Sequence, residues 1–163
     1  MTRPARRNRG FAVSSVVCGL FVVACASRGP APANVSVAPA GGLAGTTWRL
    51  VEFRSSDDRI GTVRPDNPDN YTMILEPAGR VALQLNCNRG AGTWTATPTG
   101  PDSGSFGFGP LAVTRAFCPP PSLDGQIARD AEYVRSYVLR DGRLYLNLMA
   151  DGGTYVWEPG GGR

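Results

Sequence analysis

The sequence predicts an α+β domain: a curved antiparallel β-sheet, or a partly open β-barrel, of about seven to eight strands with one short helix. Short runs of β-branched and aromatic residues recur along the chain. Turns containing some of its 21 Gly and 14 Pro separate these runs. Only one stretch has helical spacing. The 163 residues are enough for one domain with a hydrophobic core of its own.

The first half of the domain contains strand patterns joined by turns. Residues 46–53 are rich in β-forming types, and residues 55–70 read as a loop because Asp, Asn, Gly and Pro recur. Apolar side chains alternate in residues 71–76 and again in 81–85, on either side of a Pro-Ala-Gly turn, which predicts a hairpin. Two glycines, Gly90 and Gly92, are expected to interrupt the strand that follows.

Strand character resumes over residues 93–97, and residues 98–104 read as a second loop. Ser122 is in position to cap a short helix. One face of this helix carries apolar residues at helical spacing: Leu123, Ile127, Ala131 and Val134. Gly125 weakens its first turn.

The end of the chain carries a second hairpin pattern and a last strand. Asp141-Gly142 stands between two apolar alternating runs, 137–139 and 144–148, and predicts a two-residue turn. The last strand is expected over residues 154–158, and residues 159–163 form a tail.

The N-terminus reads as an export signal. Arginines precede an apolar run, Phe11–Ala24, that is too short to span a membrane comfortably. The segment ending in Ala24-Cys25 resembles the cleavage site of bacterial lipoproteins. We therefore expect residues 1–24 to be a lipoprotein signal peptide and Cys25 to be lipidated. The alternative is an ordinary signal peptide cleaved near Ala24 or Ala26.

Residues 25–42 are dominated by Pro, Ala, Gly and Ser, a composition that buries no core. We expect this segment to tether the domain to a membrane through the lipid on Cys25. The predicted location is the cell envelope, at the outer membrane if two membranes are present.

Charge and composition disfavour several function classes. The chain has no His, which removes the commonest general base and metal ligand. Its formal charge of +4 arises from four arginines in the leader: Arg3, Arg6, Arg7 and Arg9. The remaining chain is close to neutral. The sequence therefore predicts no nucleic-acid partner, no cofactor and no metal.

Two segments of the domain carry a paired motif. The first reads Asn86-Cys87-Asn88-Arg89-Gly90-Ala91-Gly92-Thr93-Trp94. The second reads Gly109-Pro110-Leu111-Ala112-Val113-Thr114-Arg115-Ala116-Phe117-Cys118-Pro119. Together they resemble the META domain family, to which the heat-shock protein HslJ belongs. Upstream, the Leu-x-Gly-x-x-Trp-x-Leu pattern of the family is matched by Leu43, Gly45, Trp48 and Leu50.

The resemblance covers residues 43–158 and has two departures. Asn86 replaces the usual Gly before Cys87; if this position needs an unusual backbone angle, Asn is the next most tolerant residue. The helix segment also lacks the acidic residue usual in the family, with Gln126 nearby. The resemblance implies a curved β fold and a role in stress tolerance or envelope maintenance.

Cys87 and Cys118 have three possible roles: a redox pair, a metal pair or a structural disulfide. A Cys-x-x-Cys motif is absent, and two thiolates without His make a poor metal site. In an oxidising envelope we favour the disulfide. It would bring Asn88 and Arg89 close to the second segment.

The polar signature residues are Asn88, Arg89, Thr114 and Arg115. They either form a functional patch or satisfy backbone groups at turns, and we favour the second explanation. Several aromatics could line a ligand groove, but on strands they are expected in the core: Trp48, Trp94, Trp157, Phe106 and Phe108.

The sequence thus predicts a non-enzymatic, monomeric envelope lipoprotein, with no catalytic residues. The alternative is a binding module, acting as an inhibitor of an envelope-attacking hydrolase or as a carrier of a small apolar ligand. An exposed contact loop or a continuous apolar pocket would favour that alternative.

Overall fold

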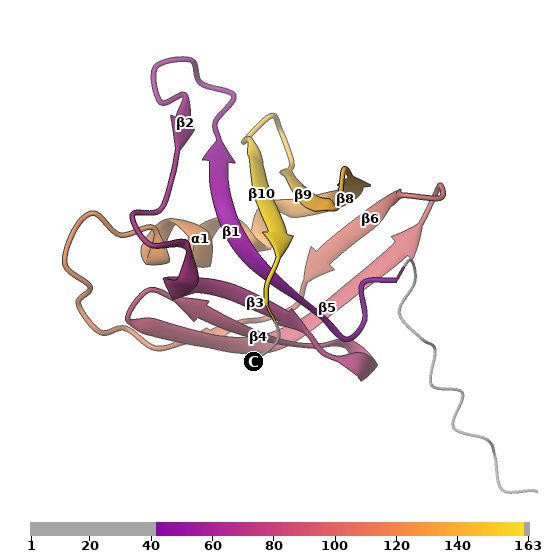
Figure 1. The fold of residues 1–163 in the computed structure, drawn as a ribbon, viewed down its shortest axis with the longest axis horizontal. Helices are drawn as coiled ribbons and strands as arrows, with labels where there is room; N and C mark the ends of the chain where they lie inside the picture. The colour runs from indigo at the N-terminus through magenta and orange to yellow at the C-terminus, as the bar shows by residue number, and fades with distance from the viewer. Residues whose placement is uncertain (1–41, 162–163) are drawn as a thin grey trace, which may run out of the picture. The chain divides into compact units, whose positions relative to one another are not determined.

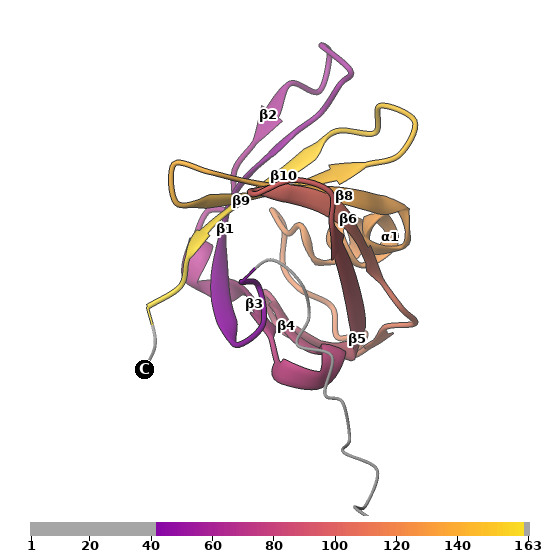
Figure 2. The same cartoon turned by 90° about the vertical axis from the view of Figure 1, so that its right-hand side faces the viewer.

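The computed structural model describes residues 42–161, which form an antiparallel β-barrel (Figures 1 and 2). The predicted signal peptide, Cys25 and most of the predicted tether lie outside the described residues. The strands are β1 Thr46–Arg54, β2 Thr62–Val63, β3 Tyr71–Leu75, β4 Arg80–Leu85, β5 Asn88–Pro98, β6 Ser103–Phe108, β7 Ala112–Val113, β8 Val134–Arg140, β9 Arg143–Leu148 and β10 Thr154–Pro159. The helical elements are η1 Pro68–Asn70, η2 Pro77–Gly79, α1 Asp124–Asp130 and η3 Ala131–Tyr133.

Eight strands form the ring of the barrel. Their order is β10-β9-β8-β6-β5-β4-β3-β1, and pairing of β1 with β10 closes the ring. The predicted curved antiparallel sheet with one short helix is confirmed. The closing contact joins the first and last strands, so local sequence patterns could not decide between an open and a closed barrel. β2 pairs with β1, and β7 pairs with β5, both outside the ring.

The core fills the ring with inward-facing side chains that alternate along each strand. Phe53 packs on Tyr155 with ring centroids 4.6 Å apart, and Trp94 stacks on Phe106 at 5.8 Å. A cavity in this core has a volume of only about 20 Å³, which is room for roughly one water molecule. Side chains, rather than a ligand space, therefore occupy the interior.

A β-bulge in β1 decides which side chains face this core. Leu50 pairs with Trp157 and Glu52 with Val156, so Val51 is the extra residue. Without it, Glu52 would share the inward face of Leu50. The bulge instead turns Phe53 into the core, and the Glu52 carboxylate accepts bonds from arginines on the outer side.

The wall of the barrel is incomplete between β6 and β8. These strands pair only where Ser103–Ser105 lies opposite residues 136–138. Beyond Ser105, β6 remains paired with β5 but has no strand partner on the side that faces β8, and β6 also contacts η3. α1 packs against the barrel beside the part of β6 that does not pair with β8 (Figure 2), and its Ile127 joins the core.

Three local predictions were wrong. Residues 55–70 are not all loop, because they contain β2 and η1. β5 runs unbroken through both glycines. Gly92 serves close packing, since a Cβ there would lie 2.5 Å from the carbonyl oxygen of Pro110. The predicted tail begins too early, because Pro159 belongs to β10 and the Gly160 amide donates to the Thr47 carbonyl at 2.8 Å.

The predicted helix exists but its ends differ from the prediction. Leu123, not Ser122, is at the N-cap, and Val134 begins β8 instead of continuing the helical face. The predicted second hairpin is confirmed: Asp141 and Gly142 both have positive φ, at 53° and 71°, as the turn between β8 and β9 requires.

Candidate functional site

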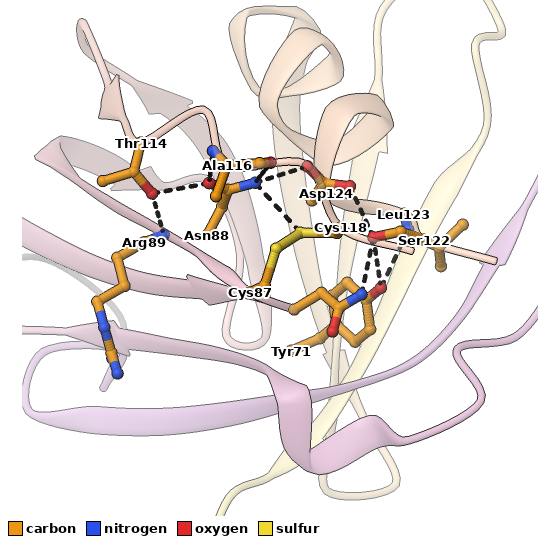
Figure 3. The surroundings of a disulfide bond; sticks show 11 residues. Tyr71, Cys87, Asn88, Arg89, Thr114, Ala116, Cys118, Ser122, Leu123 and Asp124 are labelled. Atoms are coloured by element: carbon orange, nitrogen blue, oxygen red, sulfur yellow. Dashed lines mark hydrogen bonds between the residues drawn. A yellow bond between two sulfur atoms is a disulfide. The ribbon is translucent and has the colours of Figure 1, made fainter. Parts of the chain in front are cut away.

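A disulfide between Cys87 and Cys118 joins the two signature segments, with Cα atoms 5.6 Å apart (Figure 3). Cys87 lies in the turn from β4 to β5, and Cys118 lies in the long connection from β7 to α1, residues 114–123, which we call the crossing loop. The predicted bridge is confirmed. It fastens the crossing loop to the barrel at a point where no strand holds it.

Asn88 is the centre of the hydrogen-bond network beside the disulfide. It begins β5, and only 1% of its surface is exposed. Its Oδ1 accepts from Thr114 Oγ1 and from the Ala116 amide, both at 2.8 Å. Its Nδ2 donates to the Ala116 carbonyl at 3.0 Å and to Asp124 Oδ2 at 2.9 Å. The two hydrogens of Nδ2 are thereby used, and the side chain is satisfied within the protein.

Thr114 and Arg89 extend this hydrogen-bond network, which we call the polar clamp, through backbone groups. The Arg89 amide donates to Thr114 Oγ1, and the Thr114 amide donates to the Arg89 carbonyl, both at 2.9 Å. The Arg89 side chain itself points away from the disulfide (Figure 3). The two segments are therefore adjacent, as predicted, but Arg89 contributes its main chain to the contact.

A second cluster, centred on Ser122, holds the other end of the crossing loop. Ser122 Oγ donates to Asp124 Oδ1 at 2.6 Å and accepts from Asn86 Nδ2 at 2.9 Å. The hydroxyl of Tyr71, on β3, lies 3.3 Å from Ser122 Oγ and accepts from the Leu123 amide at 3.0 Å. The crossing loop is thus tied to β3, to the β4–β5 turn and to α1.

Asn86 adopts φ 58°, which confirms that this position needs the left-handed region. Its side chain also bonds to Ser122, a contact that Gly could not make. Asn86 therefore combines a backbone role with a side-chain role.

Sequence reasoning did not assign Tyr71, Ser122 or Asp124 to the site. Asp124 supplies a carboxylate at the first residue of α1. The Ser-x-Asp spacing at the helix start was the available signal. Their partners lie about 35 to 50 residues away along the chain, so no local pattern reveals the contacts.

The Asp124 carboxylate is held in its ionised form. Partial burial opposes ionisation, but hydrogen bonds from Ser122, Asn88 and two backbone amides outweigh it and lower the pKa of Asp124 below its ordinary value. This carboxylate joins the Asn88 cluster to the Ser122 cluster. It is engaged on both oxygens.

The remaining signature residues have distinct positions. The Gly109 amide donates to the Thr93 carbonyl at 2.9 Å, and Pro110 and Leu111 pack over Gly92. Pro119 and Arg115 are exposed. The signature therefore divides into residues that fasten segments together and two arginines, Arg89 and Arg115, whose side chains are exposed to solvent.

The aromatic residues assigned to the core are found there, with Phe108 only partly buried. Within residues 42–161, no group of three His, Cys, Asp or Glu side chains is placed to hold a metal ion. In the same residues, no helix has the length and apolar character needed to cross a membrane.

The domain is therefore a closed antiparallel β-barrel whose crossing loop is fastened by a disulfide. The META domain matches residues 41–158, which is most of the chain. The chain therefore belongs to the META domain family.

Two solved structures are similar to this fold. The NMR structure of a protein from Burkholderia xenovorans has a TM-score of 0.57 at 19% identity, over 72% of this chain and 83% of that chain. The crystal structure of a DUF4847 family protein from Bacteroides vulgatus has a TM-score of 0.49 at 16% identity, over 74% and 96%. The first likeness supports the fold alone. No curated protein matches the chain.

Proposed function

We propose that this chain is a non-enzymatic envelope lipoprotein whose META domain acts by binding, in stress tolerance or envelope maintenance. The observation that carries the proposal is that the buried Asn88 side chain is fully hydrogen-bonded within the protein. A buried polar residue in a family motif would be a candidate for chemistry, but its donors and acceptors are directed at Thr114, Ala116 and Asp124. The motif thereby shapes a loop.

The lipoprotein part of the proposal comes from the sequence. Cys25 follows the apolar run at the point where lipoprotein processing occurs, and the Pro- and Ala-rich segment after it has the composition of a tether. An acyl anchor on Cys25 would hold the domain at a membrane surface.

The test uses the full chain with its leader, expressed in bacterial cells as the wild type and as Cys25→Ala. We expect the wild type to incorporate labelled palmitate and to partition with membranes, and Cys25→Ala to lose both properties. If Cys25→Ala is cleaved at the same site and still partitions into detergent, the proposed anchor is wrong.

The stress role is tested by complementation of a deletion strain under heat or detergent stress. We expect the wild type to restore growth and Cys25→Ala to restore it less. If the deletion strain grows as well as its parent under every envelope stress applied, the proposed role is wrong.

A second candidate is an inhibitor of an envelope-attacking hydrolase. It is favoured by Phe117, which is 86% exposed on the crossing loop beside the disulfide. A large aromatic on a fastened loop could enter a partner's cleft at little entropic cost. The apolar-carrier alternative receives no such support, since the cavity in the core measures only about 20 Å³.

A further inference from the structure

A groove runs along α1 on the outside of the barrel. It consists of two adjoining depressions of about 560 and 440 Å³ that share Leu111 and Ala128. Phe108 and Val113 extend its apolar floor, while Arg115 and Arg129 line the first depression. We call this surface the α1 groove. Thr114, Ala116 and Asp124, the first residue of α1, also line the first depression. Figure 3 shows Asn88 between Thr114 and Asp124.

One wall of the α1 groove is formed by the edge of a β-strand, β7. β7 pairs with β5 on one side, and no strand within residues 42–161 pairs with its other side. The pairing of β6 with β8 also ends at Ser105. An unpaired edge offers backbone donors and acceptors to an added strand, a recurrent way of binding extended peptides.

The charges of the α1 groove are separated along its length. Arg115 and Arg129 have no carboxylate within salt-bridge distance among the described residues. Asp124 lines the same depression with its oxygens bonded to Ser122 and Asn88, and its single negative charge leaves the two arginines in excess there. Glu132 lines only the second depression. One end of the groove therefore favours an anion, and the other end does not.

We infer that the α1 groove binds an extended peptide segment of a partner protein, with acidic residues at one end followed by apolar residues. The acidic end lies against Arg115 and Arg129, and the apolar end lies over Leu111 and Ala128 towards Phe108. This inference rests on the proposed binding role and identifies the surface that performs it. It makes no use of the lipid anchor.

The test uses the exported full chain, purified from whichever cell fraction contains it, with detergent added only if that fraction is the membrane. The probe is the fluorescent peptide acetyl-Glu-Glu-Val-Thr-Val-Val-amide, and the comparison peptide has Lys in place of both Glu. We expect saturable binding of the acidic peptide. A photoreactive version should crosslink to residues 90–115 and 116–129, the tryptic fragments that contain the two sides of the groove.

The decisive variant is Arg115→Glu/Arg129→Glu, in which both changes are at exposed positions. We expect about a tenfold or greater loss of affinity for the acidic peptide, since two exposed ion pairs are replaced by repulsion. The variant should prefer the Lys peptide. Arg59→Glu/Arg140→Glu is the control, because it makes the same change in net charge at exposed arginines outside the groove lining.

Three outcomes would overturn the inference. One is no saturable binding of the acidic peptide up to millimolar concentration. Another is an equal loss in the control variant, which would indicate general attraction to a basic protein. The third is displacement by free pentanoate at the same concentration as the peptide, which would make the groove a small-carboxylate site. Failure here leaves the membrane partition and palmitate results unchanged, so the two proposals fail separately.

Discussion

The barrel interior and the crossing loop are stabilised in opposite ways. The interior is held by apolar side chains from all eight strands of the ring, packed around a cavity of about 20 Å³. Most residues of the crossing loop are exposed, including Phe117 at 86%. It is held instead by one disulfide and by hydrogen bonds to Asn88, Asn86 and Tyr71. The signature motif of the family therefore fixes a surface loop that the fold alone would leave free.

The largest expected effect comes from the barrel interior. Trp94→Ala removes a side chain that is 1% exposed and that donates to the Glu76 carbonyl at 3.2 Å. We expect it to lower the free energy of unfolding by about 3 to 5 kcal/mol, because a large cavity remains. Denaturant unfolding measures this, with the exposed neighbour change Thr95→Ala as control. A loss below about 1 kcal/mol would show that the interior is not tightly packed.

The second-largest effect is expected when the disulfide between the crossing loop and the barrel is removed. Cys87→Ser/Cys118→Ser opens a covalent loop with a sequence separation of 31. We expect the free energy of unfolding to fall by about 2 to 4 kcal/mol. Because the barrel ring does not depend on the bridge, the circular-dichroism spectrum should remain predominantly β. Loss of the β spectrum in this variant would contradict the separation of the two regions.

The third effect concerns the polar clamp. Asn88→Ala leaves the Ala116 amide and carbonyl without their partner, and we expect a loss of about 1 to 3 kcal/mol. Asn147→Ala is the matched control. Its amide is half-buried between Ser136 and Thr154 on the strands, so we expect a loss of about 1 kcal/mol. Equal losses for the two variants would contradict the claim that Asn88 contributes more to stability than an ordinary asparagine on the strands.

The smallest effect is a pH dependence. The pKa of Asp124 is lower in the folded protein than in the unfolded chain, so its contribution to stability is present above the ordinary Asp pKa and is lost as pH falls through the folded value. The stability difference between wild type and Asp124→Asn should therefore shrink below about pH 4. Chemical unfolding at several pH values measures it, and a difference that grows on acidification would contradict this sign.

Glu52, which lies on β1 in the barrel wall, can be compared with Asp124. Burial opposes its ionisation, but Arg54 and Arg64 outweigh burial and lower its pKa. Glu52→Gln should show the same sign of pH dependence as Asp124→Asn. The two variants together separate the acid sensitivity of the wall from that of the crossing loop.

Much of the barrel could be predicted from the sequence, because strand patterns and turns are local. The alternation in β3 and β4 and the Asp141-Gly142 turn show this. The exceptions have physical causes. Gly92 reads as a break but serves close packing against Pro110, and Val134 fits the helical spacing but begins β8.

Only some features of the candidate site could be predicted from the sequence. The disulfide and the proximity of the two segments could be inferred because each segment contains one cysteine and an oxidising envelope favours a structural bridge. The contacts of Tyr71 and Ser122 could not, because they depend on where the crossing loop meets β3. The α1 groove was also not foreseen, since it arises where β6 stops pairing with β8.

The central claim is that Asn88 fastens the crossing loop, and amide hydrogen exchange tests it most directly. The Ala116 amide donates to Asn88 Oδ1, whereas the Leu123 amide donates to the Tyr71 hydroxyl. In Asn88→Ala, we predict faster exchange at Ala116, with protection retained at Leu123 and in β3 and β4. Unchanged exchange at Ala116, or an equal increase throughout the barrel, would contradict the claim.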